Sequence, residues 1–304
     1  MALITWNAEG VAAWAQRSGQ HAVMVQSMRG FVDAGKVGRL VCAHLLDLGS
    51  PVRVATFDVD ELLDYRSRRP EMTFSVNEWT AYEEPDLAID MVMDAEQTPY
   101  LLLHGVEPDI RWEGYISAVM EAVRRLGVGL TVAAHGIPMG VPHTRPLSST
   151  IHGTRHDLLP DTPSFFGTVQ VPASAQALLE YRLGQAGHDA VTAAVHVPYY
   201  VAQSALPAAA QHALTQIEAL TGLSLRPEGL DEDAAAARQE IDRQMAESEE
   251  VQAIVAALEV QYEQVATARA EGLPLDGPIP TADELGAEFE KFLAQQRRDL
   301  PPND

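Results

Sequence analysis

Cysteine, lysine and long apolar runs are all scarce in this 304-residue sequence. Cys42 is the only cysteine, so the chain can form neither an internal disulfide nor a zinc site built from cysteines. Because Cys42 falls in an apolar run that predicts a core helix, we expect a buried structural thiol. No run of about 18 apolar residues occurs, which argues against a membrane-spanning helix. No secretory signal is visible at the N-terminus, so we expect a cytoplasmic protein.

Positive charge is also scarce. The chain has 21 Lys and Arg residues against 43 Asp and Glu residues, which gives a formal net charge of −22. Such a charge repels nucleic acids and anionic membrane surfaces, so we expect neither as a partner. Lys36 and Lys291 are the only lysines, so few ammonium groups are present to hold the phosphates of a nucleotide.

Strand-like and helix-like segments alternate over the first two-thirds of the chain. This alternation predicts an α/β fold, with a mostly parallel central sheet flanked by helices on both faces. The stretch between the second and third expected strands has no clear period and is predicted to be irregular. Expected strands cover residues 21–28, 52–57, 87–93, 99–105, 130–136 and 190–198. Expected helices cover 36–48, 112–127, 174–186 and an alanine-rich segment that ends near Gly222.

The composition becomes strongly acidic at about residue 228. We expect residues 1–227 to form the α/β domain and residues 228–304 to form an acidic helical extension packed on or near it. Helical spacing of apolar residues predicts one long helix over residues 230–272. Thr281 and Glu284 then form a capping-box pattern, which predicts a last helix. The extension is interpreted as a packed appendage, with a partner-binding arm as the alternative.

A phosphate-loop-like pattern follows the first expected strand. Gly30, four residues, Gly35 and Lys36 match G-x-x-x-x-G-K, but Val37 replaces the hydroxyl residue that would ligate Mg²⁺. Asp33 also places a carboxylate inside the loop that would hold a polyanion. We therefore favour a glycine-bounded turn that packs strand against helix or faces another subunit. The alternative is an anion site, in which glycine amides and Lys36 contact the ligand.

Two further loops follow expected strands and carry charged residues. In an open α/β sheet, ligands bind beyond the carboxyl ends of the strands, so these loops are expected around one crevice. Arginine there could hold a carboxylate or a phosphate, whereas the prolines of the second loop suggest a rigid docking or packing loop. The candidate ligand-binding residues, added to those of the first loop, are Glu107, Asp109, Arg111, His143, Thr144 and Arg145.

Histidines are concentrated in the middle of the chain. His152 and His156 are four residues apart, a spacing that would bring two metal ligands together on a helix. The surrounding glycine and β-branched residues argue against a helix, and no third ligand follows at suitable spacing, so we predict no metal. The sequence also lacks the G-x-S-x-G and G-x-G-x-x-G patterns. We therefore predict no catalytic residue and no cofactor.

Four ordered segments resemble the PAC2 family over about residues 20–225, and the acidic tail is similar to the actinobacterial branch. These segments are GFVDAGKVG (30–38), DVDELLDYRSRRP (58–70), LLLHGVEPDIRW (101–112) and GIPMGVPHTRP (136–146). The family is related to eukaryotic proteasome assembly chaperones. The resemblance implies the α/β architecture of the purine nucleoside phosphorylase type and assembly into homo-oligomers such as trimers.

The functional implications of the resemblance are narrower. Chaperones of the family dock on proteasome α-subunits through a C-terminal hydrophobic–tyrosine–any residue tail, but this chain ends in RRDLPPND, without tyrosine. An older ATP-grasp-like classification of the family also conflicts with the presence of only two lysines. We expect a non-enzymatic homo-oligomer that binds other proteins, with proteasome subunits as candidate partners. The alternative is an enzyme or binding protein for a nucleoside, nucleotide or carboxylate that uses the strand-end loops.

Overall fold

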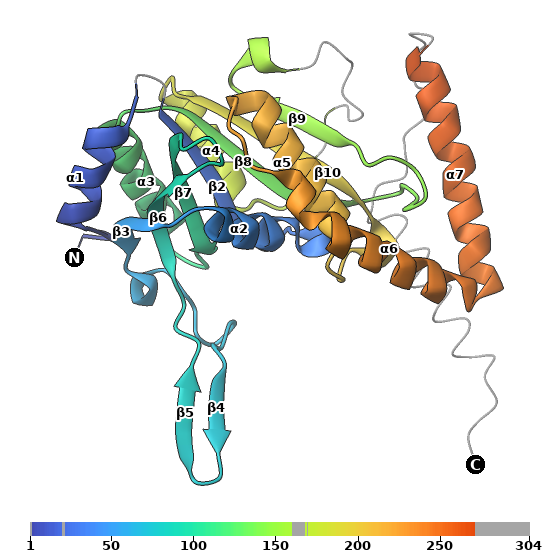
Figure 1. Ribbon diagram of the computed structural model, residues 1–304, viewed down its shortest axis with the longest axis horizontal. Helices are drawn as coiled ribbons and strands as arrows, with labels where there is room; N and C mark the ends of the chain where they lie inside the picture. The colour runs from blue at the N-terminus through green and yellow to red at the C-terminus, as the bar shows by residue number, and fades with distance from the viewer. Residues whose placement is uncertain (1, 20–21, 160–167, 169, 271–304) are drawn as a thin grey trace.

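The computed structural model describes residues 2–19, 22–159, 168 and 170–270, and its centre is an eight-stranded sheet (Figure 1). The strands of this sheet are β1 (Ile4–Trp6), β2 (Ala22–Arg29), β3 (Val52–Phe57), β6 (Leu87–Met93), β7 (Pro99–Val106), β8 (Val128–Met139), β9 (Ser149–Gly153) and β10 (Asp189–Pro198). Their spatial order is β1-β3-β6-β7-β2-β8-β10-β9.

Most strands of the sheet point the same way. β7, β2, β8 and β10 pair in parallel at the centre, whereas β1, β3 and β6 on one side and β9 on the other join through antiparallel pairs. The strands β3, β7, β2, β8 and β10 therefore share one direction. The predicted α/β fold with a mostly parallel sheet is confirmed, and the antiparallel flanks are the feature that the sequence did not indicate.

Helices cover both faces of the sheet. The helices of the domain and its extension are α1 (Ala8–Arg17), α2 (Val37–Leu48), α3 (Trp112–Leu126), α4 (Ala175–Gln185), α5 (Pro207–Thr221), α6 (Asp231–Ala246) and α7 (Glu249–Ala270). One hydrophobic cluster joins α1, α3 and α4 to the sheet, and a second joins α2 and α5 to the opposite face. None of the described helices combines the length and apolar character that crossing a bilayer requires.

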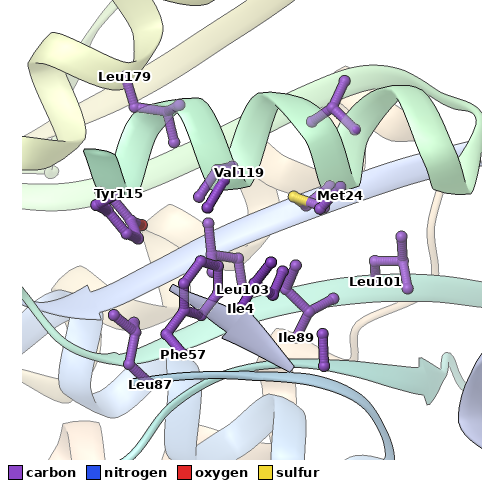
Figure 2. Close-up of a cluster of buried hydrophobic side chains, with 14 of the residues drawn as sticks. Ile4, Met24, Phe57, Leu87, Ile89, Leu101, Leu103, Tyr115, Val119 and Leu179 are labelled. Carbon is purple, nitrogen blue, oxygen red and sulfur yellow. The ribbon is translucent and has the colours of Figure 1, made fainter. Parts of the chain in front are cut away.

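The two cores follow from alternation along the central strands. Met24 on β2 belongs to the first cluster, and the next residue, Val25, belongs to the second, because successive strand residues point to opposite faces. Figure 2 shows side chains of the first cluster, with Tyr115 and Val119 on α3 directed at the sheet. The rings of Phe57 and Tyr115 lie 5.4 Å apart between centroids. Burial of these apolar side chains is the main stabilising contribution to the domain.

Residues between β3 and β6 form an exposed hairpin rather than the irregular stretch that was predicted. β4 (Met72–Ser75) and β5 (Glu78–Tyr82) pair with each other in a separate two-stranded sheet. Figure 1 shows this hairpin projecting away from the central sheet. Every residue of both strands is exposed, so no face has the buried apolar alternation from which a strand is recognised in sequence.

The acidic extension contains a break that the sequence did not indicate. The prediction of one helix over residues 230–272 is wrong, since α6 ends at Ala246 and α7 begins at Glu249. The hydroxyl of Ser248 accepts a hydrogen bond from the amide of Val251 at 3.4 Å, which gives α7 a start of its own. α6 packs on α5, and α7 leaves α6 in a different direction (Figure 1).

Three smaller expectations have different outcomes. Cys42, expected to be a buried thiol, lies on α2 as predicted but is only half-buried. The helix predicted after Thr281 lies outside the described residues. Gly127 and Gly222 follow α3 and α5 with φ of 68° and 74°, which confirms both as helix ends, because glycine adopts this left-handed conformation without a steric cost.

Candidate functional site

The phosphate-loop-like stretch connects β2 to α2, and its amides are already used within the protein. Gly35 has a φ of 67°, a conformation that suits glycine. Its N–H donates to the carbonyl of Ala202 at 2.7 Å, and its carbonyl accepts from the amide of Leu206 at 2.9 Å. These two bonds tie the loop to the segment before α5. The Gly35 amide is thus not available to cradle a phosphate.

The carboxylate of Asp33 occupies the start of α2. Its Oδ1 accepts from the amide of Gly38 at 2.7 Å, and its Oδ2 accepts from the amide of Arg39 at 3.2 Å. Burial raises the pKa of Asp33, while these backbone hydrogen bonds act in the opposite direction. A helix N-terminus is where an external anion would bind. Here the chain places its own carboxylate at that position, which supports the interpretation of a structural turn.

Close packing explains the glycine after the loop. A Cβ atom added at Gly38 would lie 2.7 Å from the carbonyl oxygen of Met28, a distance that side chains do not tolerate. The hydroxyl of Ser27 donates to the carbonyl of Gly38 at 2.7 Å. The first turn of α2 is therefore held directly against the end of β2.

Glu107, which follows β7, joins two loops of the site. It is buried, with an exposed fraction of 4%, and each of its carboxylate oxygens accepts a backbone hydrogen bond. Oε2 accepts from the amide of Phe31 at 2.6 Å, and Oε1 accepts from the amide of Ala175 at 2.7 Å. Ala175 is the first residue of α4, so the charge also faces the positive end of a helix.

Asp109 and Arg111 bind the segment between β3 and the hairpin. Asp109 accepts from the amide of Asp64 at 3.0 Å and pairs with Arg68 at 2.7 Å. Arg111 forms an ion pair with Glu61. These contacts position residues 61–68 against the loop that leaves β7.

The loops after β2 and β7 enclose a cleft of about 920 Å³, which also contacts the base of the hairpin. Among the predicted site residues, the cleft wall includes Gly30, Asp33, Lys36, Glu107 and Asp109, whereas Gly35 and Arg111 lie outside it. The arginines of the wall were not among the sequence candidates. They are Arg29, Arg39, Arg68 and Arg69.

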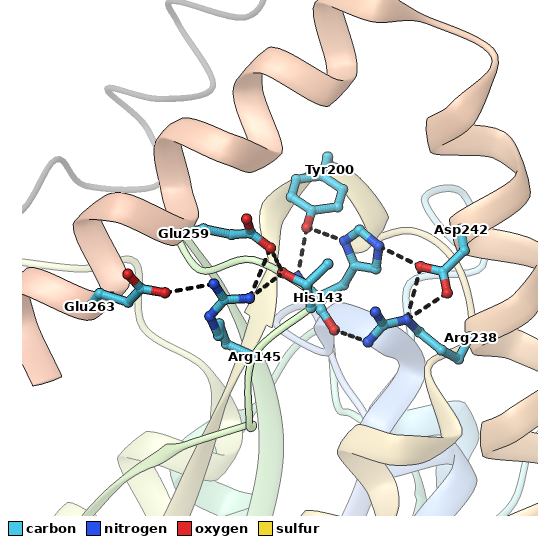
Figure 3. Close-up of polar contacts among 8 residues, drawn as sticks. His143, Arg145, Tyr200, Arg238, Asp242, Glu259 and Glu263 are labelled. Carbon is cyan, nitrogen blue, oxygen red and sulfur yellow. Dashed lines mark hydrogen bonds and ion pairs between the residues drawn. The ribbon is translucent and has the colours of Figure 1, made fainter.

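The remaining predicted site residues lie elsewhere, so the expectation of one shared crevice is wrong. Figure 3 shows His143 and Arg145 directed at the C-terminal helices. Thr144 and Arg145 both bind Glu259 on α7, the arginine at 2.9 Å. Arg145 also pairs with Glu263 at 2.6 Å. The ligand-binding role assigned to the three residues stays a prediction.

We call residues 143–145 and their partners on α6 and α7 the clamp. His143 is the centre of a second group of contacts within it. Its Nδ1 lies 2.6 Å from the hydroxyl of Tyr200, and its Nε2 lies 3.0 Å from Asp242 on α6. Arg238 pairs with Asp242 at 2.9 Å and donates to the carbonyl of His143 at 2.5 Å. Burial lowers the pKa of His143, although the hydrogen bond to Asp242 opposes this effect.

A partly buried charge network links β3, β6 and β7 and was not predicted. Asp90 contacts His104 at 2.8 Å and Arg53 at 2.6 Å, and Arg53 also pairs with Asp86 at 2.9 Å. Burial opposes a charge on His104, but its hydrogen bonds to Asp90 and Cys42 raise the pKa to about 9. Burial likewise opposes the charge of Asp90, yet His104 and Arg53 lower its pKa. The pairing of His104 with Asp90 therefore favours the charged form of both side chains.

The histidine pair at four-residue spacing does not share a helix. His152 lies on β9 and contacts Glu180 at 2.9 Å, whereas His156 lies in a short 3-10 turn. Over the part of the chain that the structure describes, no group of three or more His, Cys, Asp or Glu side chains is placed to hold a metal ion.

Comparisons with known proteins give one family. The model of the PAC2 family matches residues 27–245. The structure of Mycobacterium tuberculosis Rv2714, a protein of unknown function, has a TM-score of 0.83 and 42% identity, covering 89% of this chain and 94% of that one. The structure of a Corynebacterium glutamicum protein of unknown function has a TM-score of 0.81 and 36% identity, covering 86% of this chain and 97% of that one. The structure of M. tuberculosis Rv2125, described as a proteasome-assembly chaperone homologue, has a TM-score of 0.67 and 24% identity, covering 77% of this chain and 99% of that one. A search of curated proteins finds no match.

Proposed function

Because the chain belongs to the PAC2 family, we propose that it is a non-enzymatic, cytoplasmic homo-oligomer, such as a trimer, that binds other proteins. The proposed unit consists of an α/β domain over residues 1–227 and an acidic extension over residues 228–304. The similarity to proteins from Mycobacterium and Corynebacterium supports the actinobacterial branch of the family. Rv2125, the homologue described as related to proteasome assembly, makes proteasome subunits the first candidates for the partner.

The observation that carries this proposal is the exposed hairpin of β4 and β5. Its large apolar side chains stand in solvent, including Trp79 at 63% and Val76 at 95% exposure. The rings of Phe74 and Trp79 pack against each other at 5.1 Å between centroids. An isolated two-stranded hairpin is marginally stable in water, and a contiguous apolar patch on it favours association. A second copy or another protein would bury this surface.

The oligomeric state of a hairpin variant tests the proposal. We expect the wild-type chain to self-associate in light scattering coupled to size-exclusion chromatography. The double variant Phe74→Ser/Trp79→Ser should shift the mass toward the monomer, because it removes the apolar contact surface. Tyr181→Ser is the matched control, since Tyr181 is an exposed aromatic residue on α4, with an exposed fraction of 59%. A monomeric wild type, or an unchanged mass in the hairpin variant, would argue against the proposal.

The partner is tested separately. Purified proteasome α-subunits mixed with the chain should form a complex on native gels, and the hairpin variant should reduce that complex. Residues 299–304 contain no tyrosine, so we expect their deletion to leave the complex intact. If no complex forms, proteasome subunits are excluded as partners. Self-association is then judged separately, by the mass measurement.

A further inference from the structure

The cleft between the loops after β2 and β7 contains cations that have no internal partner. Its wall includes Arg29, Lys36, Arg39 and Arg69, and all four side chains are exposed. Among the described residues, no carboxylate lies within ion-pair distance of any of them. Arg68 is the one cation of the wall that is paired, through Asp109 at 2.7 Å. The cleft therefore contains four cations without an ion-pair partner, in a wall that also carries six carboxylates, those of Asp33, Asp64, Glu83, Glu84, Glu107 and Asp109.

Most carboxylates of the same wall are already satisfied. Asp33 accepts the two amides at the start of α2, and Glu107 accepts the amides of Phe31 and Ala175. Asp64 and Asp109 pair with Arg66 and Arg68. Only Glu83 and Glu84, at the base of the hairpin, have no such partner among the described residues. The unsatisfied groups of the cleft are thus mainly hydrogen-bond donors with positive charge.

This arrangement contrasts with the rest of an acidic chain. The chain has 43 Asp and Glu residues for 21 Lys and Arg residues, so carboxylates outnumber cations about two to one. Among the described side chains, eight of the twelve arginines outside the cleft wall form ion pairs, namely Arg53, Arg66, Arg111, Arg145, Arg155, Arg182, Arg238 and Arg243, whereas Arg17, Arg124, Arg125 and Arg226 do not. In the cleft wall only Arg68 of five cations is paired, so the charged groups of the other four are available to bind an anion.

The shape and walls of the cleft fit a small molecule. Its volume of about 920 Å³ lies within the range of ligand pockets. Phe31, 76% exposed, and the half-buried Trp112 add apolar surface beside the cations. Because Asp33 and Ala202 already bind the amides of the loop, recognition depends on side chains rather than on a backbone cradle. Guanidinium groups bind carboxylates and phosphates through paired, charge-assisted hydrogen bonds.

We propose that this cleft binds a small molecule that carries at least two anionic groups, held by Arg29, Lys36, Arg39 and Arg69. Carboxylates and phosphates share the chemistry that these cations recognise, and probes of both classes distinguish them. The site is separate from the proposed scaffold role, because the hairpin surface and the cation cluster involve different residues. Failure of one proposal therefore leaves the other standing.

Isothermal titration calorimetry of the full chain with pyrophosphate, tripolyphosphate and citrate, at constant ionic strength, tests this proposal. We expect saturable binding of at least one probe at one site per chain. The double variant Lys36→Gln/Arg39→Gln should raise the dissociation constant by about tenfold for each cation removed. The control Arg17→Gln/Arg124→Gln removes the same charge at exposed positions outside the cleft. It should change the dissociation constant by less than about twofold. Both variants should keep the wild-type Tm, because none of these side chains has an ion-pair partner among the described residues.

The probes also identify the ligand class. Binding of the phosphates but not citrate indicates a phosphate ligand, and the reverse indicates a carboxylate ligand. The absence of saturable binding by all three probes overturns the proposal, as does equal weakening by the cleft and control variants. Dissociation of an oligomer by Lys36→Gln/Arg39→Gln, without binding of any probe, would place the cations at a subunit interface and would also overturn it.

Discussion

The cleft and the clamp lie beyond the same edge of the sheet, but their cations have opposite surroundings. β2, β7 and β8 are parallel, so the loops that follow them leave from a common edge. In the clamp, Arg145 is neutralised by Glu259 and Glu263, which belong to the acidic extension. In the cleft, Lys36 and Arg39 have no such partner among the described residues. The acidic extension therefore neutralises the charged loop after β8 and leaves the loop after β2 open.

This difference gives the charge of the extension a local role. Asp242 on α6 and the two glutamates on α7 point at residues 143–145 rather than only into solvent. Exposed ion pairs contribute little individually, but several together fix the orientation of a helix. These polar contacts add to the apolar packing of α6, which places Ile241 in the second hydrophobic cluster, whereas the cleft is shaped by buried hydrogen bonds such as those of Glu107.

Removal of the Glu107 carboxylate should have the largest effect. Glu107→Ala removes two charge-assisted hydrogen bonds and leaves the amides of Phe31 and Ala175 without their acceptor. The free energy of unfolding should fall by about 3 kcal/mol or more, measured by urea denaturation. Glu84→Ala, an exposed carboxylate of the same cleft, should change it by less than about 0.5 kcal/mol. A similar small change in both variants would show that the cleft wall does not depend on Glu107.

Removal of the Arg145 charge should have an intermediate effect that is confined to the clamp. Arg145→Gln loses the ion pairs to Glu259 and Glu263, and exposed pairs of this kind stabilise a folded protein only weakly. Amide hydrogen exchange along α7 should become faster, while exchange in the loop after β2 stays unchanged. Arg243→Gln is the matched control, because Arg243 pairs only with Glu240 and Glu247 among the described residues. Equal exchange of α7 in both variants would contradict the clamp.

The sequence predicted the central fold much better than the site. The ranges 52–57 and 87–93 were predicted with the bounds of β3 and β6, since apolar or β-branched runs bounded by turn residues specify such strands locally. The hairpin has no buried face and so lacked the pattern by which strands are recognised. Arg69, just before the hairpin, and Lys36, in the loop after β2, line the same cleft only because the fold brings these segments together. Because the two residues are far apart in the sequence, no local pattern grouped them.

The clamp was hidden for a similar reason. His143 contacts Asp242 across 99 positions, and Arg145 contacts Glu263 across 118 positions. Helical spacing indicated that the extension is helical, but it does not specify which loop a helix contacts. The break at Ser248 involves short-range hydrogen bonds, such as those from Val251 to the Ser248 hydroxyl and from Gln252 to the carbonyl of Ala246, and local propensity does not show whether they outweigh a continued helix.

Acidification should give the smallest effect and should again separate the two regions. The pKa of His143 is lowered in the folded protein, chiefly by burial, while Asp242 and Glu259 oppose the shift and Arg238 adds to it. The neutral ring is therefore favoured by folding. Its contribution to stability is present above the unfolded pKa of about 6.5 and is lost as the pH falls through the folded pKa.

A comparison of urea denaturation in wild type and His143→Gln, between about pH 8 and about pH 5, measures this contribution. The stability advantage of the wild type should shrink toward acid pH, and exchange of the α6 and α7 amides should increase over the same interval. Lys36→Gln/Arg39→Gln should keep the wild-type pH dependence, because the cleft wall contains no histidine among its lining residues. An advantage that grows on acidification would mean that Asp242 outweighs burial and that the protonated ring strengthens the clamp.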